Sequence, residues 1–273
     1  MSEPPLLILG CGFTGAAAAR LARGAGREVR ATLRHDDGAD RLRAMGVAVS
    51  VTASLDPDDV RRLVGEGADV LVCFPPDGAT DARVAPAVRA ARAVAYVSTT
   101  GVYGERTGRI DGATPVDPST EKARARLDAE ARWRDEGAVV LRAAGIYGPW
   151  RGLHRRLLRG DFRAPGDGSR VVSRVHVDDL AAVALGALAN APKGGAWPLA
   201  DATPVPQGEV IAWLCARLGL PLPPSVPLDE APETLRHDRS VDPTDALRAA
   251  GVALRFPSYR EGFEHCLAVE SAG

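Results

Sequence analysis

The segment from Leu6 to Arg34 constrains the fold of this chain more than any other. It begins with an uninterrupted apolar run, Leu6-Leu7-Ile8-Leu9, which is typical of a strand buried on both faces of a parallel sheet. The alanine-rich run from Ala16 to Ala22 predicts a helix, and the run from Val29 to Leu33 predicts the next strand. Between the first strand and the helix lies Gly10-Cys11-Gly12-Phe13-Thr14-Gly15, which has the spacing G-x-G-x-x-G.

Each glycine of this motif has a mechanical role when the motif follows a strand and opens a helix. Gly10 permits a tight turn, Gly12 lets the backbone approach a pyrophosphate, and Gly15 lets the helix pack closely on the sheet. The free N–H groups and the positive dipole end of the helix then face the phosphates. We therefore expect Gly10, Gly12, Phe13, Thr14 and Gly15 to bind a dinucleotide; a glycine-rich turn of purely structural value is the alternative.

The residue that follows the second strand indicates which dinucleotide is bound. An Asp or Glu at this place suits the ribose 2′-hydroxyl of NAD, whereas an arginine suits the 2′-phosphate of NADP. Here the strand is followed by Arg34, and the first carboxylates, Asp36 and Asp37, come later in an expected turn. We expect NADP with Arg34 on its 2′-phosphate; the alternatives are NAD and a merely solvated arginine.

Further strands and helices alternate along the chain as far as Val97. Strands are expected at 47–51, 68–74 and 94–97, and helices at 40–45, from Pro57 onward and at 81–92. This alternation predicts an α/β fold with a doubly wound parallel sheet of the Rossmann type. Ligands of such sheets bind beyond the carboxyl ends of the strands, so Phe74 and Ser98 are expected beside the cofactor.

The composition narrows the classes of partner. The chain has 273 residues, of which 45% are hydrophobic, enough for one sizeable core or two smaller ones. A net charge of −1 gives no overall field that would recruit nucleic acid or an anionic membrane. The four cysteines show no C-x-x-C spacing, and the chain has neither a signal-peptide pattern nor an apolar run of about 20 residues. These features favour a cytoplasmic protein with a small-molecule substrate and no nucleic-acid or membrane partner.

The strand that ends at Val97 is followed by Ser98-Thr99-Thr100-Gly101-Val102-Tyr103-Gly104. A hydroxyl at such a strand end can donate a hydrogen bond to a carbonyl or alcohol oxygen of a substrate. The alternative is that the hydroxyl residues only complete the strand.

With these residues in view, the chain resembles the extended, NAD-dependent epimerase/dehydratase branch of the short-chain dehydrogenase/reductase superfamily. The resemblance covers most of the chain in the expected order. It rests on the glycine motif, Ser98 to Gly104, the segment Leu141-Arg142-Ala143-Ala144-Gly145-Ile146-Tyr147-Gly148-Pro149, and Val175-His176-Val177-Asp178-Asp179.

The resemblance implies a catalytic residue at Thr99 and a Tyr-x-x-x-Lys pair on the next long helix. Alignment on Pro118 and Glu130 places Lys122 where the family has tyrosine and Arg126 where it has lysine, so the chain is similar to atypical members that lack the pair. Arg126 could still hold a ribose hydroxyl or phosphate but cannot relay a proton. Lys122 could act as an acid or base only if burial favoured its neutral amine. Tyr103 is the remaining candidate for the proton donor.

The resemblance also implies two parts: a nucleotide-binding domain at 1–150 and a smaller C-terminal substrate-binding lobe at 151–273, with 171–190 returning to the main domain. In the lobe, four arginines of a basic helix could clamp an anionic substrate or form a solvated face: Arg151, Arg155, Arg156 and Arg159. The segment 236–239 is a charged loop that could face the substrate. His176 is a candidate acid or base but is better explained as architecture beside Asp178, an expected helix N-cap.

Two functions follow from these expectations. The first is an NAD(P)-dependent oxidoreductase or epimerase/dehydratase-like enzyme for a small hydroxyl or carbonyl substrate. The second is an NADP(H)-binding sensor or scaffold without turnover, which the missing Tyr-x-x-x-Lys pair favours. Thr99 and the complete second lobe favour the enzyme. A homodimer is also compatible with the resemblance.

Overall fold

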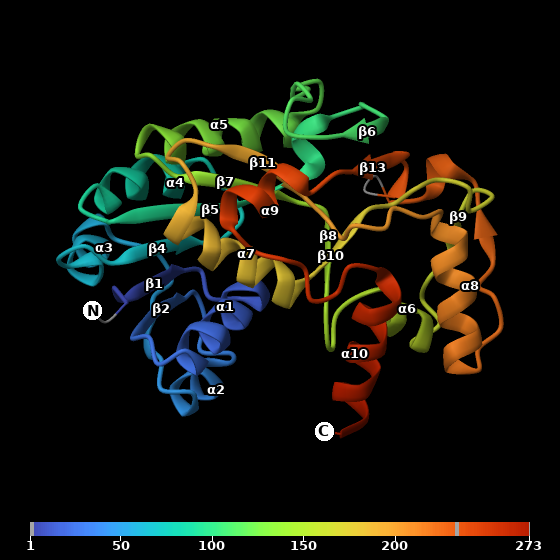
Figure 1. The fold of residues 1–273 in the computed structure, drawn as a ribbon, viewed down its shortest axis with the longest axis horizontal. Coiled ribbons are helices and arrows are strands. Elements are labelled where there is room, and N and C mark those ends of the chain that lie inside the picture. The colour runs from blue at the N-terminus through green and yellow to red at the C-terminus, as the bar shows by residue number, and fades with distance from the viewer. Residues whose placement is uncertain (1–2, 233–234, 273) are drawn as a thin grey trace.

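A seven-stranded parallel sheet forms the centre of the molecule, as shown by a computed structural model that describes residues 3–232 and 235–272 (Figure 1). The strands lie in the order β3-β2-β1-β4-β5-β7-β11. This order reverses direction at β1, so the carboxyl ends of β1 and β4 flank the switch point at which such sheets bind ligands. The strands are β1 (Leu6–Leu9), β2 (Val29–Leu33), β3 (Ala48–Val51), β4 (Asp69–Val72), β5 (Ala93–Thr99), β7 (Val139–Ala143) and β11 (Ala196–Leu199).

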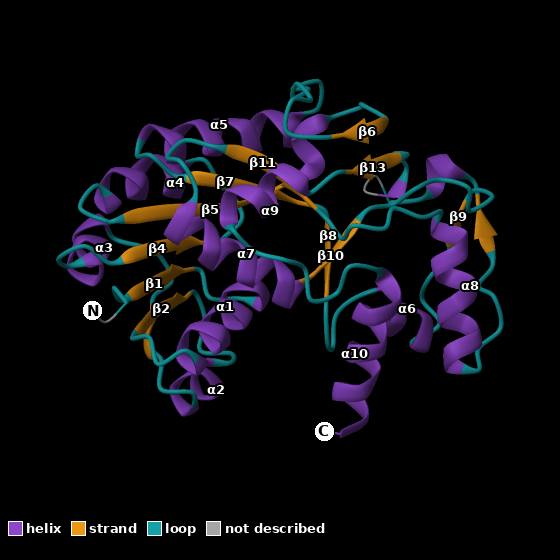
Figure 2. Cartoon of the chain, in the orientation of Figure 1, coloured by secondary structure: helices purple, strands orange, loops and turns teal. Residues whose placement is uncertain are grey.

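Helices cover both faces of this sheet (Figure 2). In β1, Leu6 and Ile8 belong to the apolar layer on one face, while Leu7 and Leu9 belong to the layer on the other. The first layer packs on α1 (Phe13–Gly24), α2 (Ala39–Ala44), α7 (Val177–Asn190) and α9 (Thr244–Ala250). The second packs on α3 (Pro57–Val64), α4 (Ala79–Val84), the 3₁₀ turn η1 (Ala85–Val88) and α5 (Glu121–Asp135). The predicted Rossmann-type doubly wound fold is confirmed.

A smaller lobe extends from the carboxyl edge of the sheet (Figure 1). Its core is built on Tyr147, Leu214 and Phe263. The parallel strand pairs are β8 (Gly145–Tyr147) with β10 (Arg174–His176), β9 (Ala164–Pro165) with β12 (Ser225–Val226), and β6 (Gly108–Ile110) with β13 (Arg239–Val241). The remaining elements are η2 (Thr100–Tyr103), α6 (Leu153–Leu158), α8 (Gln207–Leu218), η3 (Leu228–Glu230) and α10 (Tyr259–Ala272).

Local structure departs from the sequence predictions at a few places. The helix predicted over 81–92 ends at Val84, because Pro86 lacks the N–H and the space that an α-helix needs. The strand expected over 68–74 is shorter, since β4 covers only Asp69–Val72. Within the described ranges, no helix is both long and apolar enough to cross a membrane.

Candidate active site

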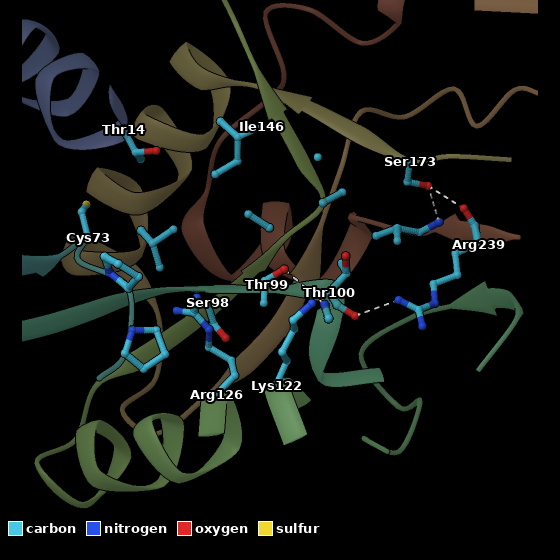
Figure 3. Close-up of a pocket in the computed structure, with 18 of the residues that line it drawn as sticks. Thr14, Cys73, Ser98, Thr99, Thr100, Lys122, Arg126, Ile146, Ser173 and Arg239 are labelled. Carbon is cyan, nitrogen blue, oxygen red and sulfur yellow. Dashed lines mark hydrogen bonds between the residues drawn. The ribbon is translucent and has the colours of Figure 1, made fainter. Parts of the chain in front are cut away.

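A cavity of about 920 Å³ lies at the carboxyl end of the sheet and extends to the second lobe (Figure 3). The glycine motif and the end of β4 line one side of it, and the end of β5 with the start of α5 lines the middle. Segments 144–146, 171–173 and 235–241 line the far side. The expected site residues on its wall are Gly10, Gly12, Phe13, Thr14, Phe74, Ser98, Thr99, Lys122 and Arg126.

The three motif glycines have the geometry that their roles require. Gly10 has φ = +79°, and a Cβ there would lie 2.7 Å from the Cβ of Phe74. A Cβ on Gly15 would lie 2.9 Å from Cγ2 of Ile8, so Gly15 allows α1 to pack closely on β1. A Cβ on Gly12 would meet no atom within 4 Å, since Gly12 borders the open cavity.

The start of α1 is suited to a phosphate group. Its N-cap is Gly12, no side chain accepts a hydrogen bond from its first N–H groups, and its first turn contains no acidic residue. The turn before it is held by Thr32, whose Oγ1 accepts the Gly10 N–H at 3.0 Å and whose carbonyl accepts the Cys11 N–H at 2.8 Å. The uncapped helix end and the open side of Gly12 together fit a dinucleotide pyrophosphate. The sequence analysis did not identify Thr32.

Arg34 lies just beyond β2, exposed, and is not among the residues that line the cavity. It is close to Asp77 on the loop after β4. Burial acts to raise the pKa of the Asp77 carboxyl, but hydrogen bonds from Thr80 and the charges of Arg34 and Arg83 outweigh it, so this pKa is lowered. Arg34 therefore stands at the outer rim of the nucleotide end, and its preference for a 2′-phosphate stays a prediction.

Thr99 and Ser98 end the central strand β5 and have different environments. Oγ1 of Thr99 accepts the Gly101 N–H at 3.2 Å, which leaves the hydroxyl proton available to a ligand in the cavity. Ser98 is buried, and its Oγ donates to Oε1 of Glu130 at 2.5 Å. Its hydroxyl proton is therefore used in a hydrogen bond within the protein, although the residue borders the cavity.

Lys122 and Arg126 project from α5 toward the cavity (Figure 3). The helix starts after Thr120, whose Oγ1 accepts the Ala123 N–H at 3.1 Å. Arg126 donates from Nη1 to the Tyr96 hydroxyl at 2.8 Å, so its guanidinium is fixed beside the end of β5. Lys122 is exposed, so the burial that its proposed acid–base role requires is absent.

Tyr103 requires a correction. It is fully buried and is not among the cavity-lining residues, and its hydroxyl accepts a hydrogen bond from Nη1 of Arg142 at 3.3 Å. Burial raises the pKa of the Tyr103 hydroxyl, with Arg142 opposing this effect. Arg142 is itself paired with Glu130 at 2.8 Å. Tyr103 is thus part of a buried polar network behind the strand, which argues against a role as proton donor.

The second lobe supplies an arginine that the sequence analysis placed only within a charged loop. Arg239, which lines the cavity, is buried and donates to the carbonyl oxygens of Thr100 (3.1 Å), Arg106 (2.7 Å) and Gly104. It ties β13 to the loop after β5 (Figure 3). His237 also borders the cavity, and a contact of segment 236–239 with a substrate stays a prediction.

His176 lies outside this cavity lining. Its Nδ1 accepts the Asp178 N–H at 3.1 Å, which makes His176 the N-cap of α7; the expectation of an Asp178 cap was wrong, since Asp178 instead pairs with Arg20 at 2.5 Å. The proton of the neutral ring is then on Nε2, which faces Nδ1 of His265 at 3.3 Å. The possible ligand atoms of His176, Asp178 and His265 lie within 4.8 Å of one another, close enough to share a metal ion. In this tautomer, however, His176 directs an N–H at His265, so we interpret the two histidines as a hydrogen-bonded pair.

Comparison with known proteins places this geometry in a family. No family model matches the chain. A conserved protein of unknown function from Silicibacter pomeroyi is 32% identical, with a TM-score of 0.84 over 98% of this chain and 99% of that one. A structure described as a proposed NAD-dependent epimerase/dehydratase from Methylobacillus flagellatus is 25% identical, with a TM-score of 0.76 over 99% and 100% of the two chains. The chain is an epimerase/dehydratase-like member of the short-chain dehydrogenase/reductase superfamily.

A curated relative of this epimerase/dehydratase-like protein matches only in part. The 3-diazoavenalumate denitrifying reductase of a Streptomyces species is 29% identical over 167 residues, which is 56% of this chain and 55% of that protein. The chain therefore spans about half the length of this relative.

Proposed function

We propose that the chain is an NADP(H)-dependent oxidoreductase, or epimerase/dehydratase-like enzyme, that acts on a small hydroxyl- or carbonyl-bearing substrate. The observation that carries the proposal is the single cavity that joins the glycine motif to Thr99. A nucleotide bound along the motif and a substrate bound at the strand end would meet within it. The M. flagellatus neighbour and the reductase relative support the same class of chemistry.

A nicotinamide supplies hydride transfer at its C4 atom when bound. Gly10, Gly12 and the start of α1 would bind the pyrophosphate, and Arg126 would hold a ribose hydroxyl. Thr99 would donate its hydroxyl proton in a hydrogen bond to the substrate oxygen and so stabilise charge that develops there. Because Tyr103 is buried and does not line the cavity, the proton for that oxygen would come from solvent.

The second candidate function is an NADP(H)-binding sensor or scaffold without turnover. The burial of Tyr103 and the absence of tyrosine from α5 favour it, since no tyrosine is among the described residues that line the cavity. The two functions share the cofactor and differ in turnover.

Titration calorimetry of the purified protein with NADPH and with NADH tests the shared part. We expect micromolar NADPH binding and much weaker NADH binding. If the protein binds neither dinucleotide, both proposed functions are contradicted. Where binding is found, NADPH oxidation is then measured against a panel of aldehydes and ketones. Turnover supports the enzyme, and consistent absence of turnover with retained binding supports the sensor.

A further inference from the structure

The turn between β8 and α6, residues 148–151, presses against the first residue of α1. The Gly148 N–H donates to the Arg151 carbonyl at 2.9 Å, and the Arg151 N–H donates to the Gly148 carbonyl at 3.0 Å. A Cβ on Gly148 would lie 2.6 Å from Cγ1 of Val177 and 3.1 Å from Cζ of Phe13. Only glycine allows this approach, so the turn is held directly beside the start of α1.

The same turn contains an unusual backbone conformation. Trp150 has φ = +67°, the one positive φ at a non-glycine residue in the described part of the chain. Its N–H donates to Oε1 of Glu270 at 2.5 Å, and Glu270 also binds His154 and Arg155. Residues in this conformation persist where the surroundings hold them, and they concentrate at ligand-binding sites. The consequence here is that the next residue, Arg151, lines the cavity.

The guanidinium of Arg151 lies over the nucleotide end of the cavity. Its Cζ is 5.0 Å from the centroid of the Phe13 ring, and Phe13 is the first residue of α1. A cation from the second lobe and the uncapped N-terminus of a twelve-residue helix therefore face the same space beside Gly12. Two positive groups so placed favour an anionic group between them.

Arg151 precedes α6 and differs in its partners from the three arginines that follow it. Arg155 pairs with Glu270 at 3.0 Å, and Arg159 pairs with Asp161 at 2.8 Å. Arg156 lies 3.7 Å from the same aspartate. Among the described residues, Arg151 has no ion-pair partner, and its guanidinium packs over the Phe13 ring. Its N–H donors are therefore available to a ligand.

We infer that Arg151 binds the pyrophosphate of the dinucleotide opposite Gly12, so that the second lobe takes part directly in cofactor binding. This inference rests on the proposed function, which assigns no cofactor contact to that lobe. A guanidinium suits phosphate oxygens because its planar fork donates two parallel hydrogen bonds. The position at the start of α1 indicates the pyrophosphate and not the 2′-phosphate, since Arg34 lies at the end of β2.

The test compares Arg151→Gln with the matched control Arg159→Gln, a neighbouring exposed arginine that does not line the cavity. Dissociation constants for NADPH and NADH are measured by calorimetry. Because both dinucleotides contain the pyrophosphate, Arg151→Gln should weaken both by about tenfold and by the same factor, as expected for one charge-assisted contact. Arg159→Gln should leave both unchanged, and Arg151→Lys, which keeps the charge, should recover part of the loss.

Several results would overturn the inference. If Arg151→Gln binds both dinucleotides as tightly as the wild type, Arg151 does not contact the cofactor, and the proposed function is unaffected. Weakening of NADPH alone would assign Arg151 to the 2′-phosphate. A loss that Arg151→Lys does not reduce would indicate a structural role. If the wild-type protein binds neither dinucleotide, the proposed function fails first, and this inference fails with it.

Discussion

Thr99 presents its hydroxyl at the end of β5 while its Oγ1 accepts the Gly101 N–H at 3.2 Å. If this hydroxyl stabilises the substrate oxygen, Thr99→Ala should lower kcat by about a hundredfold, as removal of one such donor does elsewhere. Cofactor affinity should stay within about twofold of wild type, because the glycine motif is untouched. Steady-state kinetics and calorimetry measure the two quantities, and Thr99→Ser, which keeps the hydroxyl, is the control. Equal losses of turnover and cofactor affinity would contradict this role.

Arg34 is predicted to select between the two dinucleotides. Arg34→Ala should weaken NADPH binding by about tenfold or more, because a charge-assisted phosphate contact is lost, and should leave NADH binding unchanged. Calorimetry with both dinucleotides measures the ratio. Arg61→Ala is the control, since Arg61 is an exposed arginine on α3 that pairs with Asp58. An unchanged ratio of NADPH to NADH affinity in Arg34→Ala would show that Arg34 is only a solvated charge.

At the scale of elements, α10 is attached to the start of α7 by the pair His176 and His265. Burial lowers the pKa of His176 to about 4; Asp178 opposes this shift, and His265, Arg255 and Arg20 add to it. Burial also lowers the pKa of His265. The folded state therefore keeps both rings neutral at a pH where the unfolded chain binds protons.

This difference predicts acid sensitivity with a definite sign. The stabilisation is complete above the unfolded pKa of 6.5 and is lost as the pH falls toward 4. For His176 the loss amounts to about 3 kcal/mol, at about 1.4 kcal/mol per pKa unit. Urea unfolding at a series of pH values measures it. His176→Asn can still accept the Asp178 N–H, so it should be less dependent on pH in this window. The same pH dependence in this variant would disprove the assignment.

At the scale of the whole molecule, Arg239 joins the second lobe to the loop after β5. Arg239→Ala would leave the carbonyls of Thr100 and Gly104 without this donor, the second of them in a buried bond, and we expect a loss of about 3 kcal/mol in the free energy of unfolding. Arg239→Lys should restore little, because an ammonium cannot reproduce the planar fork. Urea denaturation measures both variants. Arg217→Ala, which removes an exposed pair with Glu264, should cost no more than about 1 kcal/mol. A cost for Arg239→Ala no greater than for this control would show that the lobe is attached by other contacts.

The sequence by itself determined the sheet, the glycine turn and the position of Thr99, because each depends on short-range patterns. Apolar runs such as Leu6–Leu9 can be buried on both faces only within a covered parallel sheet, and the positive φ of Gly10 suits a residue without a side chain. The order of strands and helices then brings the carboxyl ends together, which places Thr99 and the glycine motif on one cavity.

The tertiary structure alone decided which polar side chains reach that cavity. Tyr103 and Thr99 are close in sequence, yet one is sealed against Arg142 and the other lines the cavity. Arg151 and Arg155 are four residues apart in the sequence, yet only Arg155 pairs with Glu270, which comes from the C-terminal helix. These outcomes depend on partners more than a hundred residues away in the case of Glu270, and on burial that periodicity does not specify. Local pattern therefore predicts the scaffold, whereas long-range packing selects the residues that can contact a ligand.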